Sequence, residues 1–427
     1  MLDLGELRER EAEIRAGLEA RGGEHGETVT RIIEQDEIRR EGLTEVNDLK
    51  ARRNSTSKRI GELKRAGEDA SEIIAEMRTL GDEIDAIDER VGEAERAIER
   101  LLATLPNLPL PDVPVGGEAD NRVERTSGEA PSFDFAPLAH WDLAEALGIL
   151  DLPRGAKISG SGFPVLVGAG ARLQRGLIDF FLDRHTGHGD YTELRVPYLV
   201  TSESLTGTGQ LPKFAEESYH AERDDLWAIP TAEVPVTNMH RDEILDAEDL
   251  PVRYTAYSPC FRREAGAAGR DTRGLLRVHQ FDKVELVRYE TPERSAEALE
   301  EMTGEAEWLL DALGLHWRRL LLATGDLGFS SAKTYDLEVW SPGVEQWLEV
   351  SSVSVFTDFQ SRRANIRYRP APGEKPRFVH TLNGSALALP RVMAALLETY
   401  QQPDGSVVLP ACLAEFTGFD RIEAPGN

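Results

Sequence analysis

The sequence predicts an α+β protein with three parts: an antiparallel helical hairpin over residues 1–105, a linker over 106–120, and a domain of mostly antiparallel sheet flanked by helices over 121–427. The first part contains no proline and is rich in Glu, Arg, Leu, Ile and Ala, a composition typical of long helices. The linker has four prolines and two glycines, which cannot continue a helix. Beyond it, short apolar runs and alternating segments predict strands.

The length of 427 residues, 40% of them apolar and 29% charged, indicates a soluble globular protein with two or more domains. No apolar run is long enough to span a bilayer, and the charged start MLDLGELRERE is unlike a signal peptide. The two cysteines, Cys260 and Cys412, form neither a disulfide framework nor a zinc site. We therefore expect a cytoplasmic protein that needs no zinc and does not contact a membrane.

In the second half of the hairpin, apolar residues repeat at alternating spacings of four and three. They are Ile73, Met77, Leu80, Ile84, Ile87, Val91, Ala94, Ile98 and Leu101. This pattern predicts the heptad seam of a coiled coil. The preceding helix, over about 29–63, is less regular, and residues 66–69 are a natural tip between the two. From the heptads alone, a dimerisation arm is the simplest interpretation.

The net charge of −27 disfavours nucleic-acid binding overall, because Lys and Arg must neutralise phosphates. The charge is unevenly divided, however: residues 31–66 carry ten basic against seven acidic residues, whereas 67–101 carry four against twelve. Between residues 50 and 65, seven basic residues face one acidic residue, Glu62. The seven are Lys50, Arg52, Arg53, Lys58, Arg59, Lys64 and Arg65. We call them the basic tip, and they predict a local positive surface.

Residues 257–287 predict two antiparallel strands joined by a long loop rich in glycine and alanine. Charged residues gather at the strand ends and in the loop. They are Arg262, Arg263, Glu264, Arg270, Asp271, Arg273, His279, Lys283 and Glu285. Arginine forms a planar fork of donors that suits phosphate, and glycine lets the backbone approach a ligand closely. The segment predicts a phosphate-binding surface with a flexible lid, and a solvated edge hairpin is the alternative.

Two strands that follow carry an acidic face. Residues 333–340 and 346–352 alternate apolar and polar side chains, which places Asp336, Glu338 and Glu349 on one side of a sheet. Such a face is usually solvated. Opposite the hairpin's arginines, however, it could hold Mg²⁺, because a hard cation bridges carboxylate and phosphate oxygens.

Three further segments combine polar residues with structural signals. Residues 231–233 lie in a predicted turn between apolar strands, where Thr231 could also cap a helix. Residues 191–200 predict a strand with a central proline, Pro197. Residues 380–401 predict a polar turn that leads into a helix.

The strings FRREAGAAGRDTRGL at 261–275 and HQFDKVE at 279–285 resemble motif 2 of the class II aminoacyl-tRNA synthetases, in the form found in seryl-tRNA synthetases. The resemblance covers nearly the whole chain: the hairpin is similar to the tRNA-binding arm, the region around Pro197 to motif 1, and residues 380–401 to motif 3. It implies ATP-dependent activation of L-serine to seryl-adenylate, then transfer of serine to the 3′ end of tRNA(Ser), with tRNA(Sec) as a further acceptor. It also implies ATP and Mg²⁺ as cofactors, and a homodimer with Pro197 at its interface.

The resemblance also implies roles for individual residues. The implied catalytic residues are Arg262, Glu264 and Arg391. The implied serine-binding residues are Thr231, Ala232, Glu233, Glu285, Asn383 and Ser385. The implied ATP-binding residues are Arg262, Arg263, Glu264, Val278, Phe281, Glu349, Val350, Ser351, Ser352 and Arg391, with Glu349 and Ser352 as metal ligands. By the same resemblance the basic tip would bind tRNA, since helical RNA is recognised mainly through shape and phosphates.

Some positions depart from the family. Val353, Val355 and Ala386 stand where Cys, Asn and Gly are commoner, which concerns the fit around serine rather than a charged ligand. Two other classes of protein stay open: an enzyme that activates serine for an acceptor other than tRNA, and a non-enzymatic RNA-binding relative. The basic tip disfavours the first, and the presence of all the charged motif residues disfavours the second.

Overall fold

The computed structural model describes residues 1–265 and 273–424, so Arg270 and Asp271 of the predicted loop lie outside the described residues. The chain divides into two compact units, one formed by Leu2–Leu105 and the other by Met1 with Pro106–Asn427. Across the described ranges, no helix combines the length and apolar character needed to cross a membrane.

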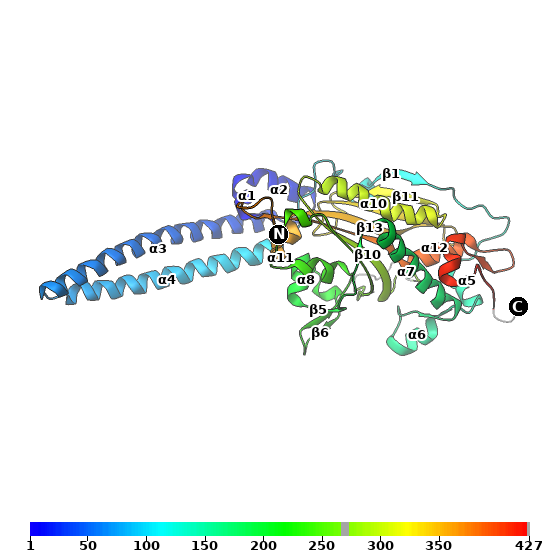
Figure 1. Ribbon diagram of the computed structural model, residues 1–427, viewed down its shortest axis with the longest axis horizontal. Helices are drawn as coiled ribbons and strands as arrows, with labels where there is room; N and C mark the ends of the chain where they lie inside the picture. The colour runs from blue at the N-terminus through cyan, green and yellow to red at the C-terminus, as the bar shows by residue number, and fades with distance from the viewer. Residues whose placement is uncertain (266–272, 425–427) are drawn as a thin grey trace. The chain divides into compact units, whose positions relative to one another are not determined.

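The smaller unit is helical. Its helices are α1 (Leu4–Glu9), α2 (Glu11–Ala20), α3 (Gly26–Ala66) and α4 (Ser71–Leu102). The long helices α3 and α4 lie side by side as an antiparallel pair (Figure 1). In the turn between them Gly67 has a φ of 73°, a left-handed conformation that glycine adopts without strain. The predicted helical hairpin is confirmed.

The predicted seam of α4 packs against α3. Its buried members are Leu80, Ile84, Ile87, Val91, Ala94 and Ile98. Val46 and Leu49 of α3 join three of them in one apolar cluster. The seam ends on Leu102, which is buried, whereas Leu101 is half-buried. The prediction that Leu101 is the last residue of the seam was therefore wrong. A straight helix has 3.6 residues per turn and drifts away from a strict heptad pattern, which accounts for the shift.

The larger unit is built on a sheet that has eight strands within the described ranges 1–265 and 273–424, in the order β1-β11-β12-β13-β16-β10-β9-β4. The strands are β1 (Arg122–Ser127), β4 (Thr192–Glu193), β9 (Val252–Phe261), β10 (Gln280–Glu290), β11 (Trp317–Leu321), β12 (Lys333–Ser341), β13 (Gln346–Thr357) and β16 (His380–Ala388). β4 runs parallel to β9, and the other neighbours are antiparallel. The predicted α+β fold with a mostly antiparallel sheet is confirmed.

Three long helices share one apolar core with this sheet. They are α7 (Ala169–His188), α10 (Ser295–Ala312) and α12 (Leu389–Tyr400). Phe181 of α7, Leu309 of α10 and Leu396 of α12 are fully buried in it. Because side chains alternate along a strand, the residues between the apolar ones point to the opposite face of the sheet.

Shorter elements complete the larger unit. The helices are α5 (His140–Ala146), α6 (Leu152–Ser159), α8 (Ser202–Thr208), α9 (Glu233–Thr237), α11 (Phe359–Ala364) and α13 (Ala414–Thr417). The strands are β2 (Leu150–Asp151), β3 (Val165–Leu166), β5 (Leu199–Thr201), β6 (His220–Ala221), β7 (Leu226–Ala228), β8 (Ile244–Asp246), β14 (Arg367–Arg369), β15 (Arg377–Phe378), β17 (Val407–Val408) and β18 (Arg421–Ile422).

Strand β16 corrects a prediction, because the start of residues 380–401 was expected to form a polar turn that leads into a helix. Leu382 and Ala386 of this strand lie in the core, whereas Asn383 and Ser385 line a cavity on the other face. The polar residues that resembled a turn are thus alternate residues of a central strand. Helix α12 follows directly.

Two other predicted elements also differ. The strand expected over 191–200 is interrupted between β4 and β5, and Pro197 lies in the gap, since proline donates no hydrogen bond to a ladder. The turn expected at 231–233 opens helix α9. The N-cap residue of this helix is Ala232 rather than Thr231, although the Thr231 hydroxyl accepts a hydrogen bond from the Glu233 N–H at 3.3 Å.

A test of the hairpin packing uses Gly42 of α3, where an added Cβ would lie 2.6 Å from Cγ2 of Val91 on α4. We expect Gly42→Leu to separate the two helices and to destabilise the hairpin by about 1–3 kcal/mol. The matched control is Gly81→Leu, because an added Cβ there meets nothing within 4 Å and leucine favours helix. Amide hydrogen exchange in residues 39–49 and 84–94 should accelerate in the first variant only. Equal exchange in both variants would contradict the close approach at Gly42.

Candidate active site

A cavity of about 760 Å³ lies on the polar face of the sheet. Its walls come from the β9–β10 hairpin, β13, β16 and the start of α12. Fourteen residues that the sequence singled out line it: Thr231, Glu233, Arg262, Glu264, Val278, Phe281, Glu285, Glu349, Val350, Ser351, Ser352, Asn383, Ser385 and Arg391. Residues far apart in the sequence therefore meet in one place.

Two of the candidate residues are not part of this lining. Ala232 is fully buried in an apolar cluster. The Arg263 guanidinium donates a hydrogen bond to the Glu216 carbonyl at 3.3 Å, and the side chain is exposed. Both residues adjoin cavity residues in sequence, but their side chains serve the surrounding structure.

A β-bulge brings the candidate metal ligands to one face. Glu349 and Ser352 are three residues apart, so a regular strand would point them in opposite directions. The pairing of β12 with β13 shifts register here, with Leu337 opposite Ser351 and Glu338 opposite Glu349. Val350 is the extra residue, and both oxygen-bearing side chains line the cavity as a result.

The most buried part of the cavity holds two carboxylates. Glu233 and Glu285 are 7% and 2% exposed. Glu285 forms an ion pair with Lys283 and accepts a hydrogen bond from the Thr231 hydroxyl at 3.2 Å. Glu233 accepts a hydrogen bond from the Gln360 amide at 2.6 Å. These groups form a small polar chamber suited to an ammonium and a hydroxyl.

Burial and the neighbouring Glu285 carboxylate raise the pKa of Glu233 to about 7. Hydrogen bonds from Gln360 and Asn383 and the Lys283 ammonium act in the opposite direction. Gln360 is itself oriented, because its oxygen accepts a hydrogen bond from the Thr381 hydroxyl at 2.7 Å. Glu233 can therefore exchange a proton near neutral pH.

The hairpin end of the cavity is basic and more open. The Arg262 guanidinium is exposed and lies 5.1 Å from the Phe281 ring centre. No carboxylate or carbonyl of the described residues accepts a hydrogen bond from it. Glu264 is ion-paired with Arg277. An open arginine beside an aromatic ring is an arrangement suited to a nucleotide.

Arg391 connects three walls of the cavity. Its Nη1 donates to the Glu349 carbonyl at 2.8 Å and lies 3.6 Å from the Glu349 carboxylate. Its Nε donates to the Leu276 carbonyl at 3.2 Å. The guanidinium is thus held at the start of α12 with its charge toward the acidic strand.

The acidic strands carry the predicted carboxylates. Glu338 is ion-paired with Arg318, which neutralises its negative charge. Burial, and next the Glu349 carboxylate, raise the pKa of Asp336 well above its usual value. Asp336 Oδ1 is buried and has no hydrogen-bond partner in the described part of the chain.

Three residues that shape the site were not assigned a role from the sequence: Lys283 and Arg277 line the cavity, and Gln360 lies outside the lining but bonds to Glu233. Lys283 lies two residues before Glu285 on β10, and this spacing could have placed both on one face. Arg277 pairs with Glu264, which lies on the other side of the predicted loop in the sequence. Gln360 reaches Glu233 from α11, and no sequence pattern connects them.

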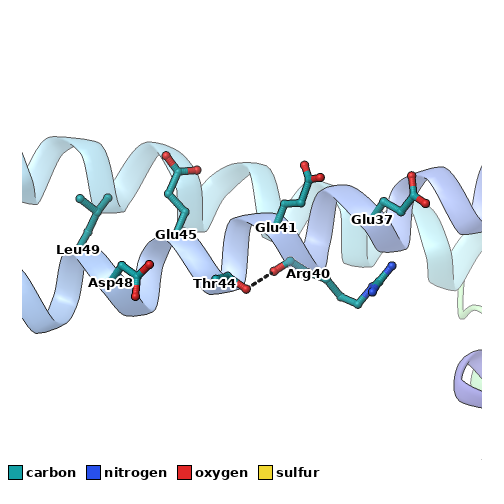
Figure 2. A pocket seen from close by; sticks show the side chains of 7 residues that line it. All are labelled: Glu37, Arg40, Glu41, Thr44, Glu45, Asp48 and Leu49. Carbon is teal, nitrogen blue, oxygen red and sulfur yellow. Dashed lines mark hydrogen bonds between the residues drawn. The ribbon is translucent and has the colours of Figure 1, made fainter.

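The basic tip lies on the distal half of α3. Lys50 pairs with Asp88 at 3.2 Å and Arg52 with Glu76 at 2.7 Å across the hairpin. No carboxylate in the described ranges pairs with the other five, which are Arg53, Lys58, Arg59, Lys64 and Arg65. The proximal half of α3 differs: Figure 2 shows Glu37, Glu41, Glu45 and Asp48 spread along the helix, where with Arg40 they line a hollow. Positive charge on this helix is therefore concentrated toward the tip.

Two family models match the chain. The seryl-tRNA synthetase N-terminal domain matches residues 1–109, and the tRNA synthetase class II core domain (G, H, P, S and T) matches residues 215–400. Among curated proteins, the serine–tRNA ligase of Gemmatimonas aurantiaca is 57% identical over 98% of this chain and 99% of the relative. That of Salinibacter ruber is 55% identical over 99% of this chain and 100% of the relative.

Solved structures agree over the full length. The seryl-tRNA synthetase from Pyrococcus horikoshii, complexed with ATP, gives a TM-score of 0.95 at 40% identity and covers 99% of this chain and 100% of that one. The cytoplasmic serine-tRNA ligase from Naegleria fowleri, in complex with AMP, gives 0.90 at 28% identity, covering 100% and 99%.

The raised pKa of Glu233 predicts a pH-dependent stability. In the unfolded chain its carboxyl ionises near pH 4.5, whereas in the folded chain it keeps its proton to about pH 7. Since the folded state binds more protons in this window, stability falls as pH rises from 4.5 to 7 and stays lowered above it. The free energy of unfolding should change by about 3 kcal/mol over this window.

We expect Glu233→Gln to remove this contribution, because the amide is neutral in both states. All six tryptophans lie in the larger unit, so urea unfolding followed by tryptophan fluorescence measures that unit. Between pH 5 and 7.5 the unmodified chain should lose more stability than the variant. Parallel losses would mean that the pKa of Glu233 is not raised.

Proposed function

The chain belongs to the seryl-tRNA synthetase family, and we propose that its cavity joins L-serine to ATP and then passes serine to tRNA. It is a class II aminoacyl-tRNA synthetase, a serine–tRNA ligase. The observation that carries the residue-level proposal is a single cavity with buried Glu233 and Glu285 in one part and Arg262 and Arg391 in another. That arrangement suits an amino acid lying next to a triphosphate.

In the first step the serine carboxylate attacks the α-phosphorus of ATP. A bond forms between the carboxylate oxygen and phosphorus, and the bond to pyrophosphate breaks, giving seryl-adenylate. Arg262 binds the α-phosphate as negative charge develops on it, and Arg391 binds the γ-phosphate. Positioning and charge neutralisation supply the rate, since little covalent work falls to the protein.

We assign the adenosine part of ATP to the cavity wall formed by the β9–β10 hairpin. Phe281 stacks on the adenine ring, Glu264 accepts a hydrogen bond from the adenine amino group, and Val278 contacts the base. Val350 and Ser351 contribute the facing wall. Arg263 is left out of this assignment, because its guanidinium is bound to the Glu216 carbonyl outside the cavity lining.

The polar chamber around Glu233 and Glu285, which we call the serine chamber, would select serine over alanine and threonine. Glu233 and Glu285 receive the ammonium and hydroxyl of serine, with Thr231, Asn383 and Ser385 as neutral partners. Alanine lacks the hydroxyl and leaves buried polar groups unpaired, which is strongly unfavourable, whereas threonine must be excluded by size.

The acidic strands fit Mg²⁺. Glu349 and Ser352 share one face through the bulge at Val350, and the buried, unpartnered Oδ1 of Asp336 adds a further oxygen. A hard cation prefers such oxygen ligands. Glu349 and Ser352 would hold the ion, which when bound neutralises charge on the β- and γ-phosphates.

In the second step a hydroxyl of the terminal ribose of tRNA(Ser) attacks the seryl carbonyl, and AMP leaves. The basic tip binds the tRNA through its phosphates. tRNA(Sec) is proposed as a second acceptor. The proposal also includes a homodimer with Pro197 at its interface and a cytoplasmic location, both of which the family resemblance supports.

The direct test is attachment of radiolabelled serine to total tRNA, with ATP–pyrophosphate exchange measured for serine, threonine, alanine and glycine. We expect transfer to tRNA, and exchange with serine alone. Exchange without transfer would instead indicate a serine-activating enzyme with another acceptor. Absence of both would reject the proposed function.

The hairpin arginines provide a matched pair. We expect Arg262→Ala to lower the rate of serine-dependent pyrophosphate exchange about 100-fold, because it removes a donor to developing charge. Arg263→Ala removes the same charge outside the cavity and should stay within about threefold of the unmodified chain. Comparable losses in both would show that the general charge of the hairpin matters rather than the position of Arg262.

The basic tip is tested by charge reversal. We expect Lys58→Glu with Arg59→Glu to raise the KM for tRNA at least about tenfold and to weaken its salt dependence. Pyrophosphate exchange without tRNA should not change. The control, Arg96→Glu with Arg100→Glu on α4, alters net charge equally away from the tip. An equal rise in KM for the control would assign the effect to overall charge.

A further inference from the structure

A buried histidine connects α5 to the residues that precede strand β10. His140, the first residue of α5, is fully buried. Its Nδ1 lies 2.8 Å from the Glu398 carboxylate of α12, and its Nε2 accepts a hydrogen bond from the Leu275 N–H at 3.1 Å. Because Nε2 accepts, the ring proton is on Nδ1 and is donated to Glu398.

Glu398 is a fixed anchor for this histidine. One carboxylate oxygen also accepts a hydrogen bond from the backbone N–H of His140 at 2.9 Å. The other accepts hydrogen bonds from the Ser341 hydroxyl and, at 2.8 Å, from the backbone N–H of Gly343. Burial acts to raise the pKa of Glu398, but the hydrogen bonds from His140 and Ser341 outweigh it and lower the pKa. The anchor therefore stays ionised and keeps the imidazole in one orientation.

The next residues of α5 hold the same segment. Trp141 lies 4.7 Å below the Arg273 guanidinium, and Asp142 pairs with it at 3.3 Å. Gly274, the residue between Arg273 and Leu275, has a φ of 67°, and a Cβ added to it would lie 2.4 Å from His140 Nε2. This approach is possible only for glycine, so the first turn of α5 and the C-terminal end of the loop fit closely.

The contact continues to the cavity. Leu275 and Leu276 line it, and the Leu276 carbonyl accepts the hydrogen bond from Nε of Arg391 at 3.2 Å. A path of hydrogen bonds and the backbone of Leu275 and Leu276 thus leads from buried Glu398 through His140 to the half-buried Arg391. Arg391 has its other bond to the Glu349 carbonyl.

We propose that His140 is a positioning residue for ATP: by holding the Leu275 N–H it fixes the Leu276 carbonyl and thereby the guanidinium of Arg391. The inference rests on the proposed function, which assigns Arg391 to the γ-phosphate. His140 does not touch the reacting atoms. Its loss should affect ATP and leave serine binding unchanged, because the serine chamber is built from other residues.

Two variants separate the two ring nitrogens. Asparagine can place its amide N–H near the Nδ1 position and keep the bond to Glu398, but it cannot reach Leu275. Glutamine can place its amide oxygen near the Nε2 position and keep an acceptor for the Leu275 N–H, while the backbone bond to Glu398 remains. His140→Asn and His140→Gln are therefore matched, and only the first removes the loop contact.

For His140→Asn we expect kcat/KM for ATP in pyrophosphate exchange to fall about five- to tenfold, with the KM for serine within twofold of the unmodified chain. For His140→Gln we expect the ATP parameters to stay nearer those of the unmodified chain. Amide exchange in residues 273–278 should be faster in the asparagine variant than in the glutamine variant. This pattern would support positioning through Leu275.

Three results would overturn the inference: equal ATP defects in both variants, a rise in the serine KM matching that for ATP, or faster exchange of 273–278 with unchanged ATP parameters. If His140→Asn does not fold, Gly274→Ala disturbs the same contact from the loop side and should produce the same ATP-specific defect. Calorimetric ATP binding measures the effect without serine. If the unmodified chain shows no serine-dependent exchange, the proposed function fails, and the calorimetric comparison still decides the role of His140.

Discussion

The candidate site depends on the alternation of side chains along the central strands β10, β13 and β16. Each strand contributes apolar residues to the core shared with α7, α10 and α12, and each lines the cavity with polar side chains such as Glu285, Ser352 and Asn383. The same hydrogen-bonded ladder therefore fixes both faces. A shift of one residue in the register of β16 would bury Asn383 and Ser385 in the core and expose Leu382 to the substrates.

Much of this could be predicted from residues close together in sequence. The heptad pattern predicted the helical hairpin of α3 and α4. The charged residues at the ends of the β9–β10 strands predicted the basic wall of the cavity. What the sequence could not show were contacts made across the fold. The bulge at Val350 depends on how β13 pairs with β12, and the bond from Gln360 to Glu233 joins two helices that no pattern relates. The start of residues 380–401 was predicted wrongly as a turn, because the polar Asn383 and Ser385 line the cavity from alternate positions of a strand.

The electrostatics reconcile an acidic protein with anionic substrates. The net charge is −27, yet positive groups stand at two places where phosphates would bind: the basic tip and the exposed Arg262 of the cavity lining. Interactions between exposed charges fade over about 8–10 Å at moderate salt, so a nearby positive group dominates over distant carboxylates. Within the cavity, charges are instead compensated in pairs, as in Lys283 with Glu285, because buried ions are unfavourable without a partner.

The two units also differ in the range of their contacts along the chain. In the hairpin, helices that follow one another pack together, whereas the sheet places β16 between β10 and β13 and β1 beside β11. Local contacts form and break quickly, while long-range pairings form slowly and together. The hairpin can therefore unfold and refold as a separate cooperative unit while the cavity persists. The cavity has no such freedom, because its walls come from strands across the whole sheet, so small ligands bound there stabilise the larger unit as a whole.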